Sequence, residues 1–375
     1  MSLPEQPVCL DDVERLAAAV LPAAVRDFIA GGSGNELTLD ANRAALDGVH
    51  LVPRVLRDVS DCTAETTLLG RPAALPMAVA PMAYHRLVHP DGELATARAA
   101  RRAGIPVTVG TLSSLPLARI AAEGARTWFQ LYWLRDRQKV SDLVKEAEEV
   151  GCEAVMLTVD VPWMGNRLRD VRNGFVLPED VVAANLSGGA SATARTARAA
   201  GSAVAAHTRE ALDSALSWRD VEEIRSRTGL PLVLKGILDP RDARRAADCG
   251  VDALVVSNHG GRQLDGAVPA IAALPGIRDA VGGHCEVLFD SGVRSGTDVL
   301  KALALGASGV LLGRPVLWGL ALGGESGATT VLRLLAEELH TALGLAGCGR
   351  VTDAQGLRAF GSAAFTALSP QPAVP

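Results

Sequence analysis

Residues 231–257 read PLVLKGILDPRDARRAADCGVDALVVS and contain one complete strand–helix–strand unit. The two ends, residues 231–235 and 253–257, are short apolar runs with β-branched side chains, and such runs predict buried strands. Residues 240–249 between them predict a helix, and Gly250 stands where a helix-ending glycine is expected. A strand, a helix and a second strand in this order predict parallel neighbours joined by a right-handed crossover.

The same unit repeats along the chain from about residue 75. Eight apolar runs alternate with helical segments: residues 75–80, 106–110, 127–131, 154–159, 231–235, 253–257, 286–290 and 309–313. Eight repeats over roughly 250 residues match a closed (β/α)8 TIM barrel of the α/β class. An open doubly wound sheet is the alternative. We favour the barrel because the count is eight and because polar residues recur at the strand ends.

We expect the 375 residues to form a single domain, with the barrel at residues 75–345. Residues 1–74 are predicted to be an N-terminal extension, with a helix at 11–30, that closes one end of the barrel. The stretch 176–215, after the fourth strand, is rich in small residues at its centre and predicts a mobile lid loop. Residues 352–375 are predicted to be a C-terminal tail.

Composition and charge exclude several function classes. Lys and Arg number 37 and Asp and Glu number 42, and no basic block is present, which argues against nucleic-acid binding. No apolar stretch is long enough to suggest a membrane span, and the acidic first twenty residues do not resemble a signal peptide. The six cysteines lie far apart without a Cys-x-x-Cys pair, which is typical of reduced thiols, so we expect a cytoplasmic protein.

The ends of the strands carry the candidate catalytic residues, since chemistry in a (β/α)8 barrel lies where strands end and βα loops begin. A lone histidine is more often structural than catalytic, but His259 follows the sixth strand between Asn258 and Gly260. A general base needs a pKa near neutrality and an orienting partner. Asp160, at the end of the fourth strand, is the candidate partner.

Three cationic residues also lie at strand ends. Arg167 and Arg262 follow the fourth and sixth strands, and two planar guanidinium groups at one mouth suit a carboxylate. Pairing of each arginine with a surface acid is the alternative. Lys235 ends the fifth strand, where it would face an anion or an electron-rich ring edge; a Schiff-base lysine is the competing interpretation.

The loops after the seventh and eighth strands predict a phosphate site. They carry Gly292, Gly296 and Gly313 together with Arg294 and Arg314. Barrels commonly bind phosphate at these two loops, where glycine lets backbone N–H groups approach the ligand. Glycine-rich turns with solvated arginines are the alternative.

Other cofactor motifs are weak or absent. His85 and His89 are four residues apart, but Pro90 follows at once and no third ligand is evident, so no metal site is predicted. The chain has no Gly-x-Gly-x-x-Gly after a strand and no P-loop, which weakens NAD and ATP as ligands.

The sequence resembles the FMN-dependent α-hydroxy-acid oxidase and dehydrogenase family, which includes glycolate oxidase, lactate oxidase and mandelate dehydrogenase. The resemblance spans about residues 11–350, and its most specific segment is SNHGGRQLD at 257–265, similar to the family signature around the active-site histidine. Supporting segments are PRVLRDVS at 53–60, QLY at 130–132, TVD at 158–160, LKG at 234–236 and DSGVRSG at 290–296.

The resemblance implies a role for each catalytic candidate. His259 would take a proton from the substrate, Asp160 would stabilise the imidazolium formed, and Tyr132 would hydrogen-bond near the reacting hydroxyl. Arg167 and Arg262 would hold the substrate carboxylate. The sequence is compatible with loss of either a proton or a hydride from the substrate Cα.

The resemblance also implies an FMN site, with Lys235 offsetting negative charge at flavin N1. The flavin would contact Ala80, Pro81, Met82, Ala83, Gly110, Gln130, Thr158, Lys235 and Ser257. Its phosphate would contact Asp290, Gly292, Arg294, Gly313 and Arg314.

Three positions depart from the glycolate-type pattern. Phe28, counted with the substrate-binding residues, replaces a Tyr that helps to bind carboxylate, so a hydrogen bond worth about 1 kcal/mol is lost. Gly110 replaces a serine and Leu112 a bulky aromatic side chain, which leaves a roomier and more apolar mouth. We therefore expect an (S)-2-hydroxy acid with an aryl side chain, mandelate or 4-hydroxymandelate, to be oxidised to the 2-keto acid while O2 is reduced to H2O2.

Several alternatives stay open. Among relatives, the chain looks most like the 4-hydroxymandelate oxidases of hydroxyphenylglycine and antibiotic biosynthesis, but a glycolate- or lactate-type oxidase is possible. A mandelate-type dehydrogenase with another electron acceptor would carry a membrane-anchoring insert after the fourth strand, where this chain has Ala, Ser and Gly. An FMN-dependent isomerase would not need two arginines beside His259, and a non-catalytic flavin-binding protein would not need the catalytic set. Relatives are often tetramers, so a homotetramer is expected.

Overall fold

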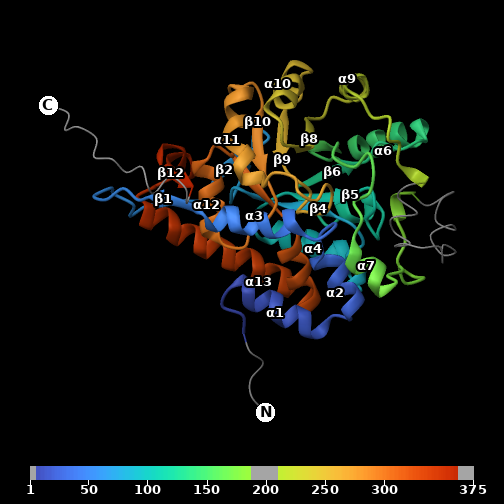
Figure 1. Ribbon diagram of the computed structural model, residues 1–375, viewed down its shortest axis with the longest axis horizontal. Coiled ribbons are helices and arrows are strands. Elements are labelled where there is room, and N and C mark those ends of the chain that lie inside the picture. The colour runs from blue at the N-terminus through green and yellow to red at the C-terminus, as the bar shows by residue number, and fades with distance from the viewer. Residues whose placement is uncertain (1–5, 187–209, 362–375) are drawn as a thin grey trace, which may run out of the picture.

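Eight parallel strands form a closed barrel in the computed structural model, which describes residues 6–186 and 210–361 (Figure 1). In chain order they are β4 (Met77–Met82), β5 (Val107–Gly110), β6 (Thr127–Leu131), β7 (Ala154–Thr158), β8 (Leu232–Ile237), β9 (Ala253–Val256), β10 (Glu286–Phe289) and β11 (Gly309–Leu312). The last strand, β11, pairs with β4 and closes the barrel. Each strand lies within two residues of its predicted position, so the TIM barrel is confirmed over the open sheet.

Helices surround the barrel and carry the crossovers (Figure 1). They are α4 (Gly92–Arg102), α5 (Leu117–Ala121), α6 (Arg137–Glu149), α9 (Trp218–Arg227), α10 (Pro240–Asp248), α11 (Ala270–Val281), α12 (Gly296–Ala304) and α13 (Arg314–Ala346). Gly250 follows α10 with a φ of 72°, which confirms its predicted role at the helix end. Within the described ranges, none of the helices combines the length and apolar character needed to cross a bilayer.

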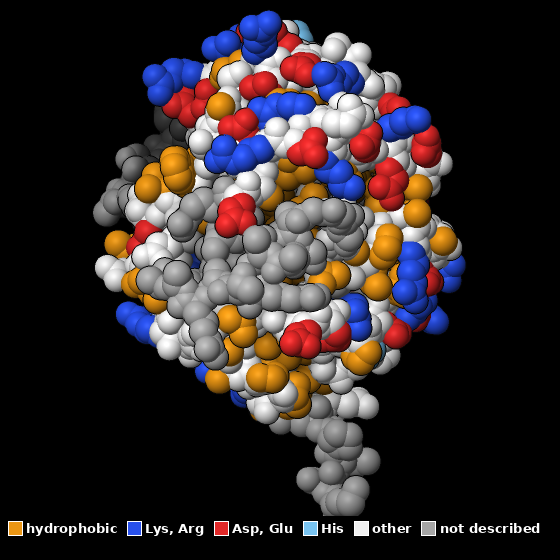
Figure 2. Space-filling view, turned by 90° about the vertical axis from the view of Figure 1, so that its right-hand side faces the viewer, with side chains coloured by type: hydrophobic (Ala, Val, Ile, Leu, Met, Phe, Trp, Pro, Cys, Tyr) orange, Lys and Arg blue, Asp and Glu red, His pale blue; other side chains and the backbone are white. Residues whose placement is uncertain are grey.

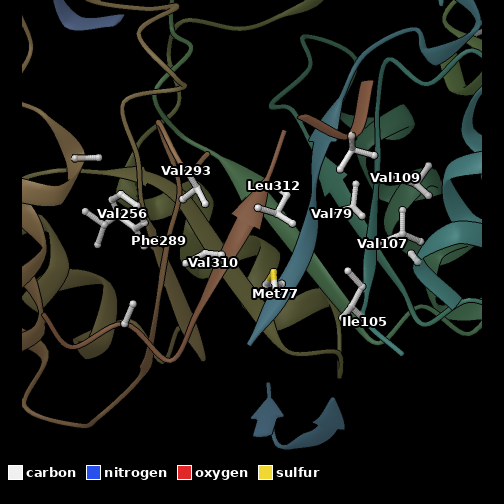
Figure 3. Packing of buried hydrophobic residues seen from close by; sticks show 14 of the residues in the cluster. Met77, Val79, Ile105, Val107, Val109, Val256, Phe289, Val293, Val310 and Leu312 are labelled. Atoms are coloured by element: carbon white, nitrogen blue, oxygen red, sulfur yellow. The ribbon is translucent and has the colours of Figure 1, made fainter. Parts of the chain in front are cut away.

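Alternate strand residues form two hydrophobic layers, as the period of a strand requires. Val79, Val310 and Leu312 belong to the large layer between strands and helices (Figure 3). Residues one position away, such as Ala80 and Leu311, point the other way into a second cluster. The inside of the barrel is therefore filled with side chains and forms a core of its own.

A hairpin from the N-terminal extension closes this inner core. Its strands are β2 (Thr66–Leu68) and β3 (Arg71–Ala73). Leu68 is 1% exposed and belongs to the inner cluster, while the backbone N–H of Leu69 donates to the Glu286 carboxylate at the start of β10 (2.9 Å). The extension thus closes the amino-terminal end of the barrel.

The rest of the extension differs from the single helix predicted at 11–30. Two helices form instead, α1 (Leu10–Val20) and α2 (Ala23–Ala30), and they lie against α13 (Figure 1). Pro22 precedes α2, and proline has no N–H to continue a helix from the preceding turn.

A further helix and a strand, which the sequence analysis did not predict, follow in the extension. They are α3 (Leu37–Asp47) and β1 (Val49–Val52). The strand β1 pairs antiparallel with β12 (Arg358–Gly361), so the first part of the predicted tail is ordered against the extension.

Most of the predicted lid, residues 187–209, lies outside the described residues, and its mobility stays a prediction. The described flanks are tied to the barrel. Asn185 accepts a hydrogen bond from the Leu117 N–H (2.9 Å) and donates to the Gly110 carbonyl (3.2 Å). Leu212 forms an antiparallel bridge with Leu134. A short helix, α7 (Leu168–Asn173), follows β7 before this segment.

We expect Leu68→Ala to lower the free energy of unfolding by roughly 2–5 kcal/mol, because it removes a fully buried side chain from the closed end of the barrel. Urea unfolding followed by circular dichroism measures the change. Leu345→Ala is the matched control, since Leu345 is 76% exposed and should change stability by less than about 0.5 kcal/mol. Equal effects of the two substitutions would contradict the proposed closure by Leu68.

Candidate active site

A cavity of about 1060 Å³, measured out to its opening, lies at the carboxyl ends of the strands. This volume includes open solvent at the mouth of the cavity. Its lining contains sixteen of the predicted residues: Phe28, Ala80, Pro81, Met82, Ala83, Leu112, Tyr132, Arg167, Lys235, His259, Arg262, Asp290, Gly292, Arg294, Gly313 and Arg314. The other predicted residues, Gly110, Gln130, Thr158, Asp160, Ser257 and Gly296, lie outside that lining.

His259 and Asp160 form the expected pair. The Nδ1 atom of His259 is 3.0 Å from Oδ1 of Asp160. Burial lowers the pKa of His259 although Asp160 opposes this, while the charges of His259 and Lys235 hold the pKa of Asp160 below its usual value despite burial. Asp160 is therefore ionised and accepts the Nδ1–H, which leaves Nε2 of a neutral imidazole free to take a proton.

A left-handed backbone turn presents His259 to the cavity, with a φ of 59°. Its N–H donates to the Ser257 hydroxyl (3.0 Å), and the next N–H, from Gly260, donates to the Ser291 hydroxyl (3.0 Å). Such a conformation is strained for a residue with a Cβ and persists only where its surroundings fix it.

Two buried amides provide a second anchor for this turn. Asn42 on α3 donates to Oδ1 of Asn258 (2.9 Å), and Asn258 donates back to Oδ1 of Asn42 (2.7 Å). The Asn258 Oδ1 atom also accepts the N–H of Gly261 (3.1 Å). The helix α3 of the N-terminal extension therefore positions the histidine turn, a role that no sequence pattern at Asn42 predicts.

Lys235 is buried and lies 2.9 Å from Oδ2 of Asp290 and 2.9 Å from the Ser257 hydroxyl. Burial alone would lower its pKa, but Asp290 and Asp160 outweigh burial and raise it. The amine is therefore charged. A Schiff-base lysine needs a neutral amine, so this geometry favours the electrostatic role.

Arg167 and Arg262 both lie near the Phe28 ring, with their Cζ atoms 6.0 and 5.4 Å from its centroid. Arg262 donates to the backbone carbonyls of Phe28 and Gly31 (2.8 Å each). The Nε of Arg167 is buried and has no hydrogen-bond partner among the described residues. Burial lowers the pKa of both guanidinium groups, so an anionic ligand between them would be bound strongly.

The opposite end of the cavity fits a phosphate. Burial lowers the pKa of Arg314 to about 9 and that of Arg294 to about 10, so neither cation is fully compensated by the protein. Gly292 lies beside them with a φ of 108°, and a Cβ there would be 3.0 Å from Leu46. These three residues match the predicted phosphate site and fit the FMN that the resemblance implies.

Behind the lining, a chain of hydrogen bonds fixes the predicted flavin residues. The Gln130 amide donates to the Thr158 hydroxyl (3.0 Å) and accepts the N–H of Thr111 (3.2 Å). All three residues are buried. Their fixed positions set the shape of the cavity floor.

The apolar part of the cavity combines Phe28 and Leu112, which the sequence analysis singled out, with residues that it did not. Phe28 stacks on Phe175 with ring centroids 4.5 Å apart, and Leu112 and Met164 also line the cavity. The unpredicted lining residues are Ile29, Met164, Gly260, Ser291, Val293, Leu311 and Leu317. Several of these residues are next to predicted ones in the sequence. Most are apolar, and an apolar residue does not by itself indicate a binding role in a sequence.

No group of three or more His, Cys, Asp or Glu side chains gathers as a metal site within residues 6–186 and 210–361. His85 is buried, and its Nδ1 pairs with the Thr96 hydroxyl (2.9 Å). Its ring therefore belongs to the packing between β4 and α4.

Comparison with known proteins identifies the family. Residues 17–358 match the model of the FMN-dependent dehydrogenase family, and the chain belongs to this family. Its cofactor is FMN. The chain is 60% identical to a 4-hydroxymandelate oxidase of Amycolatopsis orientalis, over 93% of this chain and 97% of that protein.

More distant relatives and solved structures agree with this assignment. An L-lactate oxidase of Nostoc sp. is 46% identical over 94% of this chain and 98% of that protein. The crystal structure of a mandelate oxidase with (S)-4-hydroxymandelic acid superposes with a TM-score of 0.93 and 58% identity, covering 95% of this chain and 99% of that one.

We expect Arg294→Met to raise the dissociation constant of FMN about 10-fold or more, because a hydrogen bond to a charged group contributes about 1.5–3 kcal/mol. Flavin fluorescence on titration of the cofactor-free protein measures the constant. Riboflavin, which lacks the phosphate, is the control ligand and should bind both proteins equally. An equal loss of affinity for both flavins would place the phosphate elsewhere.

Proposed function

We propose that the protein is an FMN-dependent oxidase of (S)-2-hydroxy acids with an aryl side chain, such as mandelate and 4-hydroxymandelate. The observation that carries the proposal is the placement of the Arg167–Arg262 pair beside the His259 base and an apolar wall in one cavity. The 60% identity to a 4-hydroxymandelate oxidase supports the same substrate class.

Each of the polar residues in the cavity has its own role in the proposed reaction. Arg167 and Arg262 bind the substrate carboxylate and so place the hydroxyl-bearing carbon near Nε2 of His259, with Tyr132 close to the hydroxyl. His259 takes the proton that the substrate loses, and ionised Asp160 stabilises the imidazolium. When bound, FMN would be held at its phosphate end by Arg294 and Arg314 and would supply the two-electron redox chemistry between the substrate and O2. The overall change is 2-hydroxy acid plus O2 to 2-keto acid plus H2O2.

The apolar wall favours an aryl group over a small side chain. Phe28 offers no hydroxyl to a carboxylate, and its ring is held by Phe175. Leu112 and Met164 complete an apolar surface that a phenyl ring would cover and that glycolate would leave in contact with water. Oxidation of lactate is the second candidate, because a lactate oxidase is 46% identical to this chain.

A visible spectrum of the anaerobic protein, before and after addition of (S)-mandelate, tests the proposal. The flavin absorption band should disappear and return on admission of air, with release of peroxide. Disappearance without recovery in air would indicate a dehydrogenase with another acceptor. A spectrum that changes with lactate or glycolate but not with mandelate would overturn the aryl substrate.

The remaining partner predictions rest on the sequence. We propose a homotetramer, as the family resemblance implies, and a cytoplasmic location, as the cysteine pattern of the sequence implies. On the face shown in Figure 2, basic and acidic side chains are interspersed and form no continuous basic patch, which is consistent with small-molecule substrates rather than nucleic acid.

The pH dependence of kcat/KM should follow His259. Because burial lowers the pKa of His259 below its usual 6.5 and the base acts in the neutral form, activity should fall only on the acid side of that value. Asp160→Asn removes the charge that stabilises the imidazolium, so the acid limb should move to lower pH and the plateau should fall about 100-fold or more. Asp279→Asn, at an exposed carboxylate, is the control. An unchanged plateau in Asp160→Asn would contradict the assigned role.

A further inference from the structure

Asp170 is a buried carboxylate that the proposed mechanism does not use. It lies on α7 three residues after Arg167, and the residue is 1% exposed. Both carboxyl oxygens are buried without a hydrogen-bond partner in the described part of the chain. A buried carboxylate normally accepts several hydrogen bonds, so an unpartnered one has an unusual electrostatic state.

The charges around Asp170 belong to the substrate site. Arg167 and Arg262 favour its ionised form, while burial and the nearby Asp27 carboxylate on α2 oppose ionisation. The net effect, with burial as the largest cause, is to raise the pKa of Asp170. Asp27 itself is hydrogen-bonded to Asn173 (2.8 Å) and is held ionised, so its charge is constant.

The two unpartnered groups complement each other. The Nε of Arg167 has no acceptor and the Asp170 oxygens have no donor, yet these residues form no direct hydrogen bond. Asp170 therefore offsets the positive charge of the arginine pair without occupying its donors. The Arg167 Nε stays free for a ligand, whereas Arg262 keeps its hydrogen bonds to the Phe28 and Gly31 carbonyls.

We propose that Asp170 is the built-in counter-charge of the arginine pair and that it takes up a proton from solution when a carboxylate ligand binds between Arg167 and Arg262. The inference rests on the proposed function, since it assumes that this pair binds the substrate carboxylate. A second negative charge beside the same cations makes ionised Asp170 less stable, so binding and protonation are linked. Ionised Asp170 weakens the binding of substrate and keto-acid product alike, which makes it a positioning residue that sets affinity.

Binding of phenylacetate to the FMN-loaded protein tests the inference, since phenylacetate has the carboxylate and ring but no hydroxyl to oxidise. The dissociation constant is measured from the flavin spectrum between about pH 5 and 8, a range above the usual pKa of a carboxyl group. Calorimetry in two buffers of different ionisation enthalpy gives the number of protons taken up. Protons that bind to His259 are common to all variants, so a difference between variants reports Asp170.

We expect Asp170→Asn to bind phenylacetate roughly 5-fold or more tightly than wild type at the upper end of this range. The two affinities should converge as the pH falls, because wild-type Asp170 is then already protonated. The variant should also take up fewer protons. Asp170→Ser, smaller but equally neutral, should behave in the same way if the asparagine variant does not fold.

Glu286→Gln is the matched control, because Glu286 also has a buried and unpartnered carboxyl oxygen but lies at the opposite end of the barrel. It should keep the wild-type affinity and proton uptake. Weaker binding by both Asp170 variants at every pH, or unchanged proton uptake, would show that Asp170 only supports the shape of α7. If such variants still oxidise mandelate, the proposed function stands and this inference fails. Failure of wild-type protein to bind phenylacetate would overturn this inference, while the mandelate spectrum would still decide the proposed function.

Discussion

Positive charge enclosed at the mouth of the barrel is the constraint on which the site depends. Cations held away from bulk water cost free energy unless anions compensate them. Lys235 has such an anion, because Asp290 lies 2.9 Å away. Arg314 and Arg262 instead donate to backbone carbonyls, which satisfy their hydrogen bonds but carry no net charge. The remaining positive charge is available to ligands, and both a hydroxy acid and FMN are anions.

The same positive charge also lowers the pKa of His259, the proposed base. His259 lies close enough to Lys235 and Arg167 for both to lower its pKa, in addition to the larger effect of burial. Asp160 opposes them from 3.0 Å and keeps the imidazole oriented. A histidine surrounded by cations without this carboxylate would resist protonation in the transition state, whereas an isolated His–Asp pair would be protonated before the substrate arrives. The combination gives a neutral imidazole, which suits the proposed role of His259 as a base.

The sequence predicted the elements that follow from local pattern and missed those that depend on distant contacts. The eight strands were predictable because a repeated apolar period needs no tertiary information, and the barrel then placed His259, Asp160 and the arginines at one mouth. The pairing of Asn42 with Asn258 joins residues 216 positions apart, and although Asn258 lies in the signature segment, no local pattern predicts its partner. Asp170 was missed for a different reason. Its character comes from burial without partners, and the sequence gives only the residue type.

The N-terminal extension holds two arginines of the cavity in place without cancelling their positive charge, which carboxylates of the barrel could not do. The helix α2 ends at Ala30, and the carbonyls of its last turn have no helical partners and carry the partial negative charge of a helix C-terminus. Arg314 donates to the Ile29 and Gly31 carbonyls (2.9 and 3.0 Å), and Arg262 donates to the Phe28 and Gly31 carbonyls. These contacts fix both guanidinium groups in place. A carboxylate in the same position would orient the arginines equally well but would cancel the charge that binds the ligand, so a helix end is the better support.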